Sequence, residues 1–261
     1  MIVSRRHKYF FLHCRKTAGS SLSVSLARDL GPDDLQLSGL RETAAAGIAF
    51  TDRVNSEARA ALADLPKGRL RKRLDLAGLR GAERKMLATT KLIRAKYRPA
   101  LGHHCQHAPA ARIKPAFADE WDAFSKFCIV RNPWDKTVSD YYWRIRDAQD
   151  PPSFEAFVHA MDEGNPMGGI VPVDVMDNWP LYTIDDAIIA DAVIRYEALA
   201  DDLAKAMADL NIPFDGWLPR AKGSHRPKAA KGNRHTLFDD TTRAIVARLF
   251  EKEIETFGYT F

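Results

Sequence analysis

A chain of 261 residues, of which 46% are apolar and 28% charged, can bury a full hydrophobic core, and this excludes an intrinsically disordered protein. We expect a single domain over residues 1–261. The net charge of +5 is unevenly distributed, because residues 66–98 hold twelve Lys or Arg and only two acids. Such local excess attracts polyanions, although it also suits a solvated helix face.

Cysteine content and hydropathy bear on the compartment. Cys14, Cys105 and Cys128 are odd in number and lack CxxC spacing, so neither a disulfide framework nor a zinc site is indicated. This favours a reducing compartment. The apolar run at residues 9–12 is far shorter than the core of a signal peptide, and no stretch has the length of a membrane span. We therefore expect a cytoplasmic protein without a membrane span.

Strand and helix signals alternate along the chain. Residues 9–12 are typical of a buried strand, and the apolar spacing after Ser21 predicts a helix that ends near Gly31. Residues 41–98 predict a basic helical insertion that covers the core. Further strands are expected at residues 127–130 and 192–194, and helices at about 134–146, from 195 to about 210, and from Asp239 or Asp240 to Gly258. This order predicts an α/β fold in which a P-loop-like parallel sheet is flanked by helices.

The segment between the first strand and the first helix has the composition of an anion site. In an open parallel sheet, ligands bind beyond the carboxyl ends of the strands. Glycine allows close backbone approach, hydroxyls donate to anionic oxygens, and the helix start offers unpaired N–H groups. The expected contacts are Arg15, Lys16, Thr17, Ala18, Gly19, Ser20 and Ser21. Because Lys16 precedes the glycine, this is not a Walker A loop; the alternative is a structural turn with a surface lysine.

This loop resembles the PKTGGTSL-type loop of the Golgi-type carbohydrate sulfotransferases, including the heparan-modifying enzymes, and of their bacterial relatives. The resemblance implies that Lys16 contacts the 5'-phosphosulfate of 3'-phosphoadenosine 5'-phosphosulfate and its leaving oxygen. Arg15 stands where the family has proline, and Ala18 replaces a frequent glycine. The arginine either loosens the turn or adds an anion contact.

Residues 127–142, FCIVRNPWDKTVSDYY, resemble the family's FxFVRNPxxRxVSxYY segment. The resemblance implies that Arg131 and Ser139 bind the 3'-phosphate of the donor. An arginine at a strand end can reach a phosphate with its planar fork. The alternatives are an ion pair with Asp135 for Arg131 and an idle helix hydroxyl for Ser139. Two separate anion sites suit a donor with phosphates at both ends of its ribose, whereas a triphosphate needs only one.

Weaker matches follow in the family's order. Residues 193–203 resemble VxRFExLxxDL and residues 254–261 resemble DxxxFGYxF, and both are expected to serve packing. Residues 231–234 occupy the place where relatives close over the nucleotide, so Lys231 and Arg234 are further expected donor contacts.

Transfer to a hydroxyl needs a base with a pKa near neutrality, for which histidine is the natural candidate. Gln106-His107-Ala108-Pro109-Ala110 resembles the family's His-x-[Ser/Thr]-Ala segment, and Gly102-His103 resembles the Gly-His of the heparan 2-O-sulfotransferases. We favour His107 over His103, with His104 third. Glu42 or Glu57 from the insertion are alternatives.

The resemblance as a whole implies a sulfotransferase that needs no metal and releases adenosine 3',5'-bisphosphate. The expected acceptor offers a free hydroxyl, in the first place that of a carbohydrate, possibly an anionic one, and no nucleic-acid partner is expected. Two alternatives stay open. One is a magnesium-dependent nucleotide kinase or other phosphotransferase, and the other is a non-catalytic polyanion-binding module with salt-sensitive binding by residues 67–73.

Overall fold

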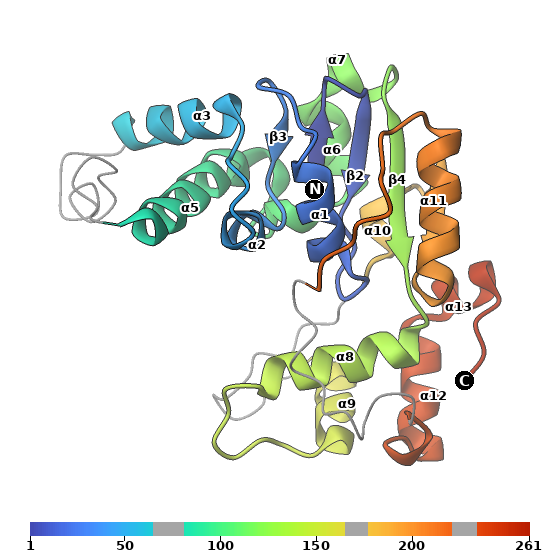
Figure 1. Cartoon of the computed structure of the whole chain (residues 1–261). Coiled ribbons are helices and arrows are strands. Elements are labelled where there is room, and N and C mark those ends of the chain that lie inside the picture. The colour runs from blue at the N-terminus through green and yellow to red at the C-terminus, as the bar shows by residue number, and fades with distance from the viewer. Residues whose placement is uncertain (65–80, 165–176, 221–233) are drawn as a thin grey trace.

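The central feature of the computed structural model, which describes residues 1–64, 81–164, 177–220 and 234–261, is a sheet at the middle of the molecule (Figure 1). The described residues form a five-stranded sheet in the order β3-β1-β2-β4-β7. Its strands are β1 Ile2–Ser4, β2 Tyr9–Leu12, β3 Leu35–Gln36, β4 Ser125–Val130 and β7 Ala192–Arg195. β2, β4 and β7 run parallel, whereas β1 is antiparallel to both β2 and β3.

The predicted parallel sheet is thus confirmed at its three predicted strands, and the sequence interpretation missed the antiparallel edge. β1 has three residues, too few to display a period of two. It is held by Asp34, whose carboxylate accepts from the Ser4 hydroxyl at 2.7 Å and from the Arg5 backbone N–H at 2.6 Å. These contacts join positions about 30 residues apart, which local patterns do not register.

Helices cover the sheet and its carboxyl edge. The α-helices are α1 Gly19–Ala27, α2 Leu40–Ala45, α3 Asp52–Ala63, α5 Ala82–Leu101, α6 Ala110–Ala116, α7 Ala118–Trp121, α8 Pro133–Ile145, α9 Phe154–Glu163, α10 Trp179–Tyr182, α11 Leu199–Asp209, α12 Asp240–Leu249 and α13 Glu251–Phe257. Short 3-10 turns are η1 Cys105–His107, η2 Tyr196–Ala198 and η4 Arg234–Thr236, and β5 Thr183–Ile184 pairs with β6 Ala187–Ile188. Within the described ranges, no helix combines the length and the apolarity that crossing a membrane requires.

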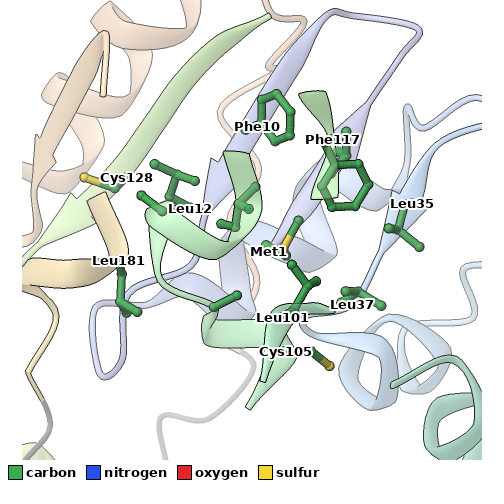
Figure 2. Close-up of a cluster of buried hydrophobic side chains, with 14 of the residues drawn as sticks. Met1, Phe10, Leu12, Leu35, Leu37, Leu101, Cys105, Phe117, Cys128 and Leu181 are labelled. Atoms are coloured by element: carbon green, nitrogen blue, oxygen red, sulfur yellow. The ribbon is translucent and has the colours of Figure 1, made fainter. Parts of the chain in front are cut away.

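Alternate residues of the strands feed two separate apolar cores. Phe10 and Leu12 of β2 point into a cluster that also contains Cys128 of β4 and residues of α5 and α6 (Figure 2). Tyr9 and Phe11 face the opposite cluster, which α1 and α11 cover. Because side chains of a strand alternate between faces, the uninterrupted apolar run of β2 is explained by burial on both sides.

A third apolar cluster lies at the carboxyl end of the sheet. There α8, α9 and α12 pack together through Trp134, Phe157 and Val246 (Figure 1). α8 begins as predicted, with Pro133 in its first turn and the Asn132 side chain accepting from the Trp134 N–H at 3.1 Å. This packing holds α8 across the edge where the loops after β2 and β4 emerge.

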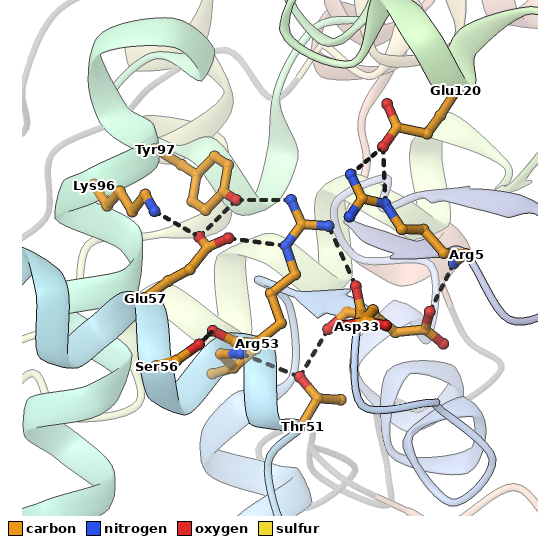
Figure 3. A network of polar contacts seen from close by, with 11 residues as sticks. Arg5, Asp33, Thr51, Arg53, Ser56, Glu57, Lys96, Tyr97 and Glu120 are labelled. Carbon is orange, nitrogen blue, oxygen red and sulfur yellow. Dashed lines mark hydrogen bonds and ion pairs between the residues drawn. The ribbon is translucent and has the colours of Figure 1, made fainter.

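The helices predicted at residues 41–98 are present where this segment is described, as α2, α3 and α5; that the segment is an insertion stays a prediction, and residues 65–80 lie outside the described residues. α3 and α5 are joined by a polar network around Glu57 (Figure 3). The Glu57 carboxylate accepts from Arg53 Nε at 2.9 Å and from the Tyr97 hydroxyl at 2.7 Å, and Lys96 Nζ lies 3.1 Å away. Burial alone would raise the pKa of Glu57, but these hydrogen bonds outweigh it and hold the pKa below its ordinary value.

Glu57→Gln is expected to destabilise the protein by about 1–2 kcal/mol at pH 7, because an amide accepts weaker hydrogen bonds than a carboxylate. The folded state lowers the pKa of Glu57, so its stabilising effect is present above the ordinary pKa and is lost as the pH falls. The difference from wild type should therefore vanish in acid. Urea unfolding from pH 7 to pH 3 measures this, with the exposed Glu83→Gln as the control. A constant difference across that range would contradict the assignment.

The predicted last helix is broken in two. Asp239 caps α12 and Gly258 ends α13 with φ +63°, as expected, but Phe250 leaves the helical conformation at φ −122°. Phe250 is buried beside α8, with Lys136 Nζ 4.0 Å from its ring centre. The break turns α13 so that Glu253 pairs with Lys136 at 2.6 Å. Helical periodicity alone cannot predict such a break, because its cause is a contact with another helix.

Candidate active site

The loop between β2 and α1 has a backbone suited to anions. Lys16 and Ala18 both adopt left-handed conformations with φ +63°. Ala18 is the N-cap residue of α1 and makes no side-chain cap, and the first turn of the helix contains no acid. The helix start therefore presents backbone N–H groups together with the positive end of its dipole. Its neighbours Arg15, Ser20 and Ser21 are half-buried at the same edge.

Ala18→Gly is expected to stabilise the protein by about 0.5–1 kcal/mol, because the left-handed strain of alanine exceeds the extra entropy that glycine loses on folding. This corresponds to a rise in Tm of about 1–4 °C. Differential scanning calorimetry measures it. Ala60→Gly, at an exposed site inside α3, is the matched control and should lower the Tm. A lower Tm for Ala18→Gly would contradict the strain argument.

The side chains of Thr17 and His13 pack against the backbone of the loop. The Thr17 hydroxyl donates to the Cys14 carbonyl at 3.1 Å and so braces the loop, whereas the sequence predicted it as a donor to anionic oxygens. Gly19 lies against the ring of buried His13, and a Cβ at this position would come within 2.0 Å of His13 Cδ2. Glycine is therefore required by His13 as well as by any approaching ligand.

The second predicted segment meets the first at its backbone. Arg131 is buried at the end of β4, and its Nη1 donates to the Lys16 carbonyl at 3.1 Å. The guanidinium lies 4.1 Å from the ring centre of Tyr196. Ser139 is half-buried two turns along α8. The parallel pairing of β2 and β4 thus brings the two segments to one edge of the sheet, more than a hundred residues apart in the chain.

The histidines differ in their relation to this edge. His107 is half-buried, and its Nδ1 lies 2.7 Å from the backbone carbonyl of His13. Because a carbonyl only accepts, Nδ1 carries the proton, and Nε2 is then the basic nitrogen of the neutral ring. The His107 and His13 rings lie 4.5 Å apart. His103 is exposed, and its ring lies 4.9 Å from that of His104.

The remaining predicted site residues fall into three groups. Glu57, an alternative base, is held by Arg53, Lys96 and Tyr97 between α3 and α5. Glu42 is half-exposed on α2. Lys231 lies outside the described residues, and Arg234 is described only by its backbone at the start of η4.

Sequence reasoning missed Asp140 of α8 and Asn178 before α10, and it gave Trp143 of α8 another role. Asp140 is buried and bonds to Arg144 Nε at 2.7 Å; burial raises its pKa, against the opposing charges of Arg144 and Lys16. Trp143, considered only as a stacking aromatic, lies 4.9 Å from Lys16 Nζ and 4.0 Å from the Arg146 guanidinium. Asn178 bonds to the backbone of Arg15. Spacing along α8 could have indicated Asp140 and Trp143, since they lie one turn beyond Lys136 and Ser139, but nothing local indicates Asn178.

The two weaker motifs serve packing, as expected. Glu197 accepts from the Asn132 backbone N–H at 2.7 Å, and the Asn132 side chain donates to the Thr260 carbonyl at 2.9 Å. Arg195 Nη2 donates to the Phe257 carbonyl at 3.1 Å. Both motifs therefore fix the turn between β4 and α8, which carries Arg131.

The sheet with its parallel strands β2, β4 and β7 and the helices that flank it define an α/β protein. A family model described as the sulfotransferase family matches residues 1–260, and the chain belongs to that family. It is thus a transferase. The chain is also 32% identical to an uncharacterized protein of Archaeoglobus fulgidus over 97 residues. The aligned residues make up 36% of this chain and 72% of that protein. A solved sulfotransferase from Alicyclobacillus acidocaldarius is similar over 97% of this chain and 98% of its own, with 18% identity and a TM-score of 0.39.

Proposed function

We propose that this protein transfers a sulfuryl group from 3'-phosphoadenosine 5'-phosphosulfate to an acceptor hydroxyl, with Lys16 and His107 at the reacting atoms. The observation that carries the proposal is the bond from Arg131 Nη1 to the Lys16 carbonyl, at 3.1 Å. It supports the proposal because the Lys16 loop and Arg131 are in contact, and a donor with phosphate groups at both ends of its ribose would need a cation near each of them. A nucleoside triphosphate would need only the first site.

The donor fits the residues present. The uncapped start of α1 and the left-handed turn at Lys16 and Ala18 suit the 5'-phosphosulfate. Arg131 and Ser139 are the proposed holders of the 3'-phosphate, with Lys231 and Arg234 as further proposed contacts. The donor supplies an activated sulfuryl group, and the chain supplies placement and charge. No step of this mechanism requires a metal.

The reaction follows from these placements. The acceptor oxygen forms a bond to sulfur while its proton passes to Nε2 of His107. The bond from sulfur to the bridging phosphate oxygen breaks, and the ammonium of Lys16 and the N–H groups of α1 stabilise the charge that develops there. Adenosine 3',5'-bisphosphate leaves. The His13 carbonyl holds the His107 ring in the tautomer that accepts a proton.

The proposed acceptor is a carbohydrate, possibly an anionic one. Half-exposed Trp143 lies beside Lys16 and Arg146, so an aromatic face and a cation flank the proposed transfer point. We also propose a single domain and a cytoplasmic location, the latter supported by three buried cysteines that are free thiols.

Calorimetry with adenosine 3',5'-bisphosphate and with ATP, each with and without magnesium, tests the donor. We expect the bisphosphate to bind more tightly than ATP, without magnesium, and Arg131→Ala to weaken it by at least about tenfold through loss of charge-assisted hydrogen bonds. Arg59→Ala is the control, because Arg59 is an exposed arginine of α3, away from the loop after β2. Tighter, magnesium-dependent ATP binding would indicate a kinase, and binding without any transfer of labelled sulfate would indicate a polyanion-binding module.

A further inference from the structure

We propose that Asn178 is a positioning residue that fixes the backbone on which the catalytic lysine is carried. This inference rests on the proposed function, because it concerns the affinity of the same loop for the donor. Asn178 is 0% exposed and lies just before α10. Its Oδ1 accepts from the Arg15 N–H at 2.8 Å, and its Nδ2 donates to the Arg15 carbonyl at 3.1 Å. A single amide side chain therefore pairs with both backbone groups of one loop residue.

Those two groups lie beyond the end of the sheet. The pairing of β2 with β4 ends at Leu12 and Cys128, so Arg15 is past the ladder that would have bonded its backbone. Buried backbone groups need partners, and the primary amide has the donor and the acceptor that a neighbouring strand would supply. Asn178 thus continues the ladder for one residue without a strand.

The next residue, Lys16, is held by a second side chain, that of Arg131. The Lys16 carbonyl accepts from Arg131 Nη1 at 3.1 Å, directly after the Arg15 carbonyl accepts from Asn178. Consecutive carbonyls are therefore fixed by side chains from two separate segments, the end of β4 and the residues before α10. Lys16 itself adopts a left-handed backbone, which persists only where the surroundings define it. The two contacts define the direction in which the lysine leaves the loop.

The Asn178 amide is needed because position 15 is an arginine. Proline, which stands here in the loop that this segment resembles, has a fixed φ and no N–H. Arginine has neither property, so its N–H needs a partner and its backbone needs a restraint. Asn178 supplies both, which answers the question of whether Arg15 loosens the turn: the turn is held by a side chain 163 residues away.

Asn178 is itself rigidly supported. Its backbone carbonyl accepts from the Leu181 N–H at 2.9 Å in the first turn of α10. The neighbouring Trp179 N–H bonds to the Asp177 carboxylate at 2.9 Å, and the Trp179 indole to Asp186 at 2.8 Å. Trp179 and Leu181 belong to the larger apolar core. The amide is therefore anchored to the apolar core.

Calorimetry with adenosine 3',5'-bisphosphate as the probe tests the inference. Asn178→Ala should bind it about tenfold more weakly than wild type, the equivalent of one to two lost hydrogen bonds. Asn55→Ala is the matched control, because Asn55 also bonds backbone carbonyls, those of Phe50 and Thr51, but on α3. It should bind the probe as wild type does. Equal affinity of wild type and Asn178→Ala overturns the inference, whereas no binding by wild type overturns the proposed function.

Asn178→Asp separates positioning from a general loss of structure and serves if the alanine variant does not fold. Its carboxylate can accept from the Arg15 N–H but opposes the Arg15 carbonyl, whereas the neutral acid can donate to it. The ratio of wild-type to variant affinity should therefore fall toward one as the pH is lowered. A variant with wild-type affinity at every pH overturns the inference.

A double-mutant cycle identifies the partner. Arg15→Pro removes the N–H that Asn178 holds and supplies its own restraint on φ. Asn178→Ala should then weaken probe binding by a smaller factor in the Arg15→Pro background than in wild type. The same factor in both backgrounds overturns the assignment of Asn178 to Arg15.

Discussion

Lys16→Ala is expected to lower kcat by about 10²–10³ at saturating donor, the size of effect seen when a single group that stabilises developing negative charge is removed. The ammonium carries a full charge, and the left-handed backbone of Lys16 and the Arg131 bond restrain the loop that carries it, just before α1. Transfer of labelled sulfate to an accepted sugar measures kcat. Lys91→Ala, on an exposed face of α5, is the charge-matched control and should retain wild-type turnover.

His107→Ala should affect the same step and lower kcat by about 10²–10⁴, the usual contribution of a general base. Its loss should also remove the fall in rate at acid pH that a histidine base imposes. His103→Ala is the matched control, since His103 is exposed beside His104. If Lys16→Ala and His107→Ala both retained wild-type turnover, the assigned mechanism would be wrong. If only His103→Ala lost activity, the base would be His103 instead.

Lys136→Met is expected to destabilise the protein by about 3–5 kcal/mol, because it leaves a buried carboxylate without its cation. Lys136 and Glu253 are 1% and 2% exposed and pair at 2.6 Å. The Tyr182 hydroxyl donates to the other oxygen of Glu253 at 2.9 Å, and burial raises the pKa of Tyr182, so this hydroxyl stays protonated. Both carboxylate oxygens of Glu253 therefore accept from a buried donor.

Guanidinium chloride unfolding measures the loss, and two further variants define its origin. The triple variant Lys136→Met, Glu253→Leu, Tyr182→Phe removes all three polar groups and should be less destabilised than Lys136→Met alone. Lys205→Met removes an exposed partner of Asp209 and should leave the unfolding midpoint unchanged. A loss in Lys136→Met no larger than that in Lys205→Met would show that the pair is not buried in solution.

The sequence was sufficient wherever a feature is local. The strands at residues 9–12 and 127–130, the capped start of α8 at Asn132 and Pro133, and the end of α13 at Gly258 all follow from hydrophobic patterns and capping residues within a few positions. The family resemblance also has a local basis, because both anion segments are continuous in the chain. The segments at residues 15–21 and around Arg131 could therefore be recognised without coordinates, and their role in donor binding stays a prediction.

Tertiary structure alone decided the partners of these segments. The two candidate bases, His107 and His103, are distinguished by the bond from His107 to the His13 carbonyl, which lies 94 positions away in the chain. The break at Phe250 follows from packing on α8, and the restraint on Arg15 comes from Asn178, 163 positions away. Local sequence reports periodicity and turn preference, whereas these contacts depend on how β2 and β4 pair and on which helices that pairing brings together. The two candidate anion-binding segments were thus visible in the sequence, whereas the contacts that hold them in place depend on the fold.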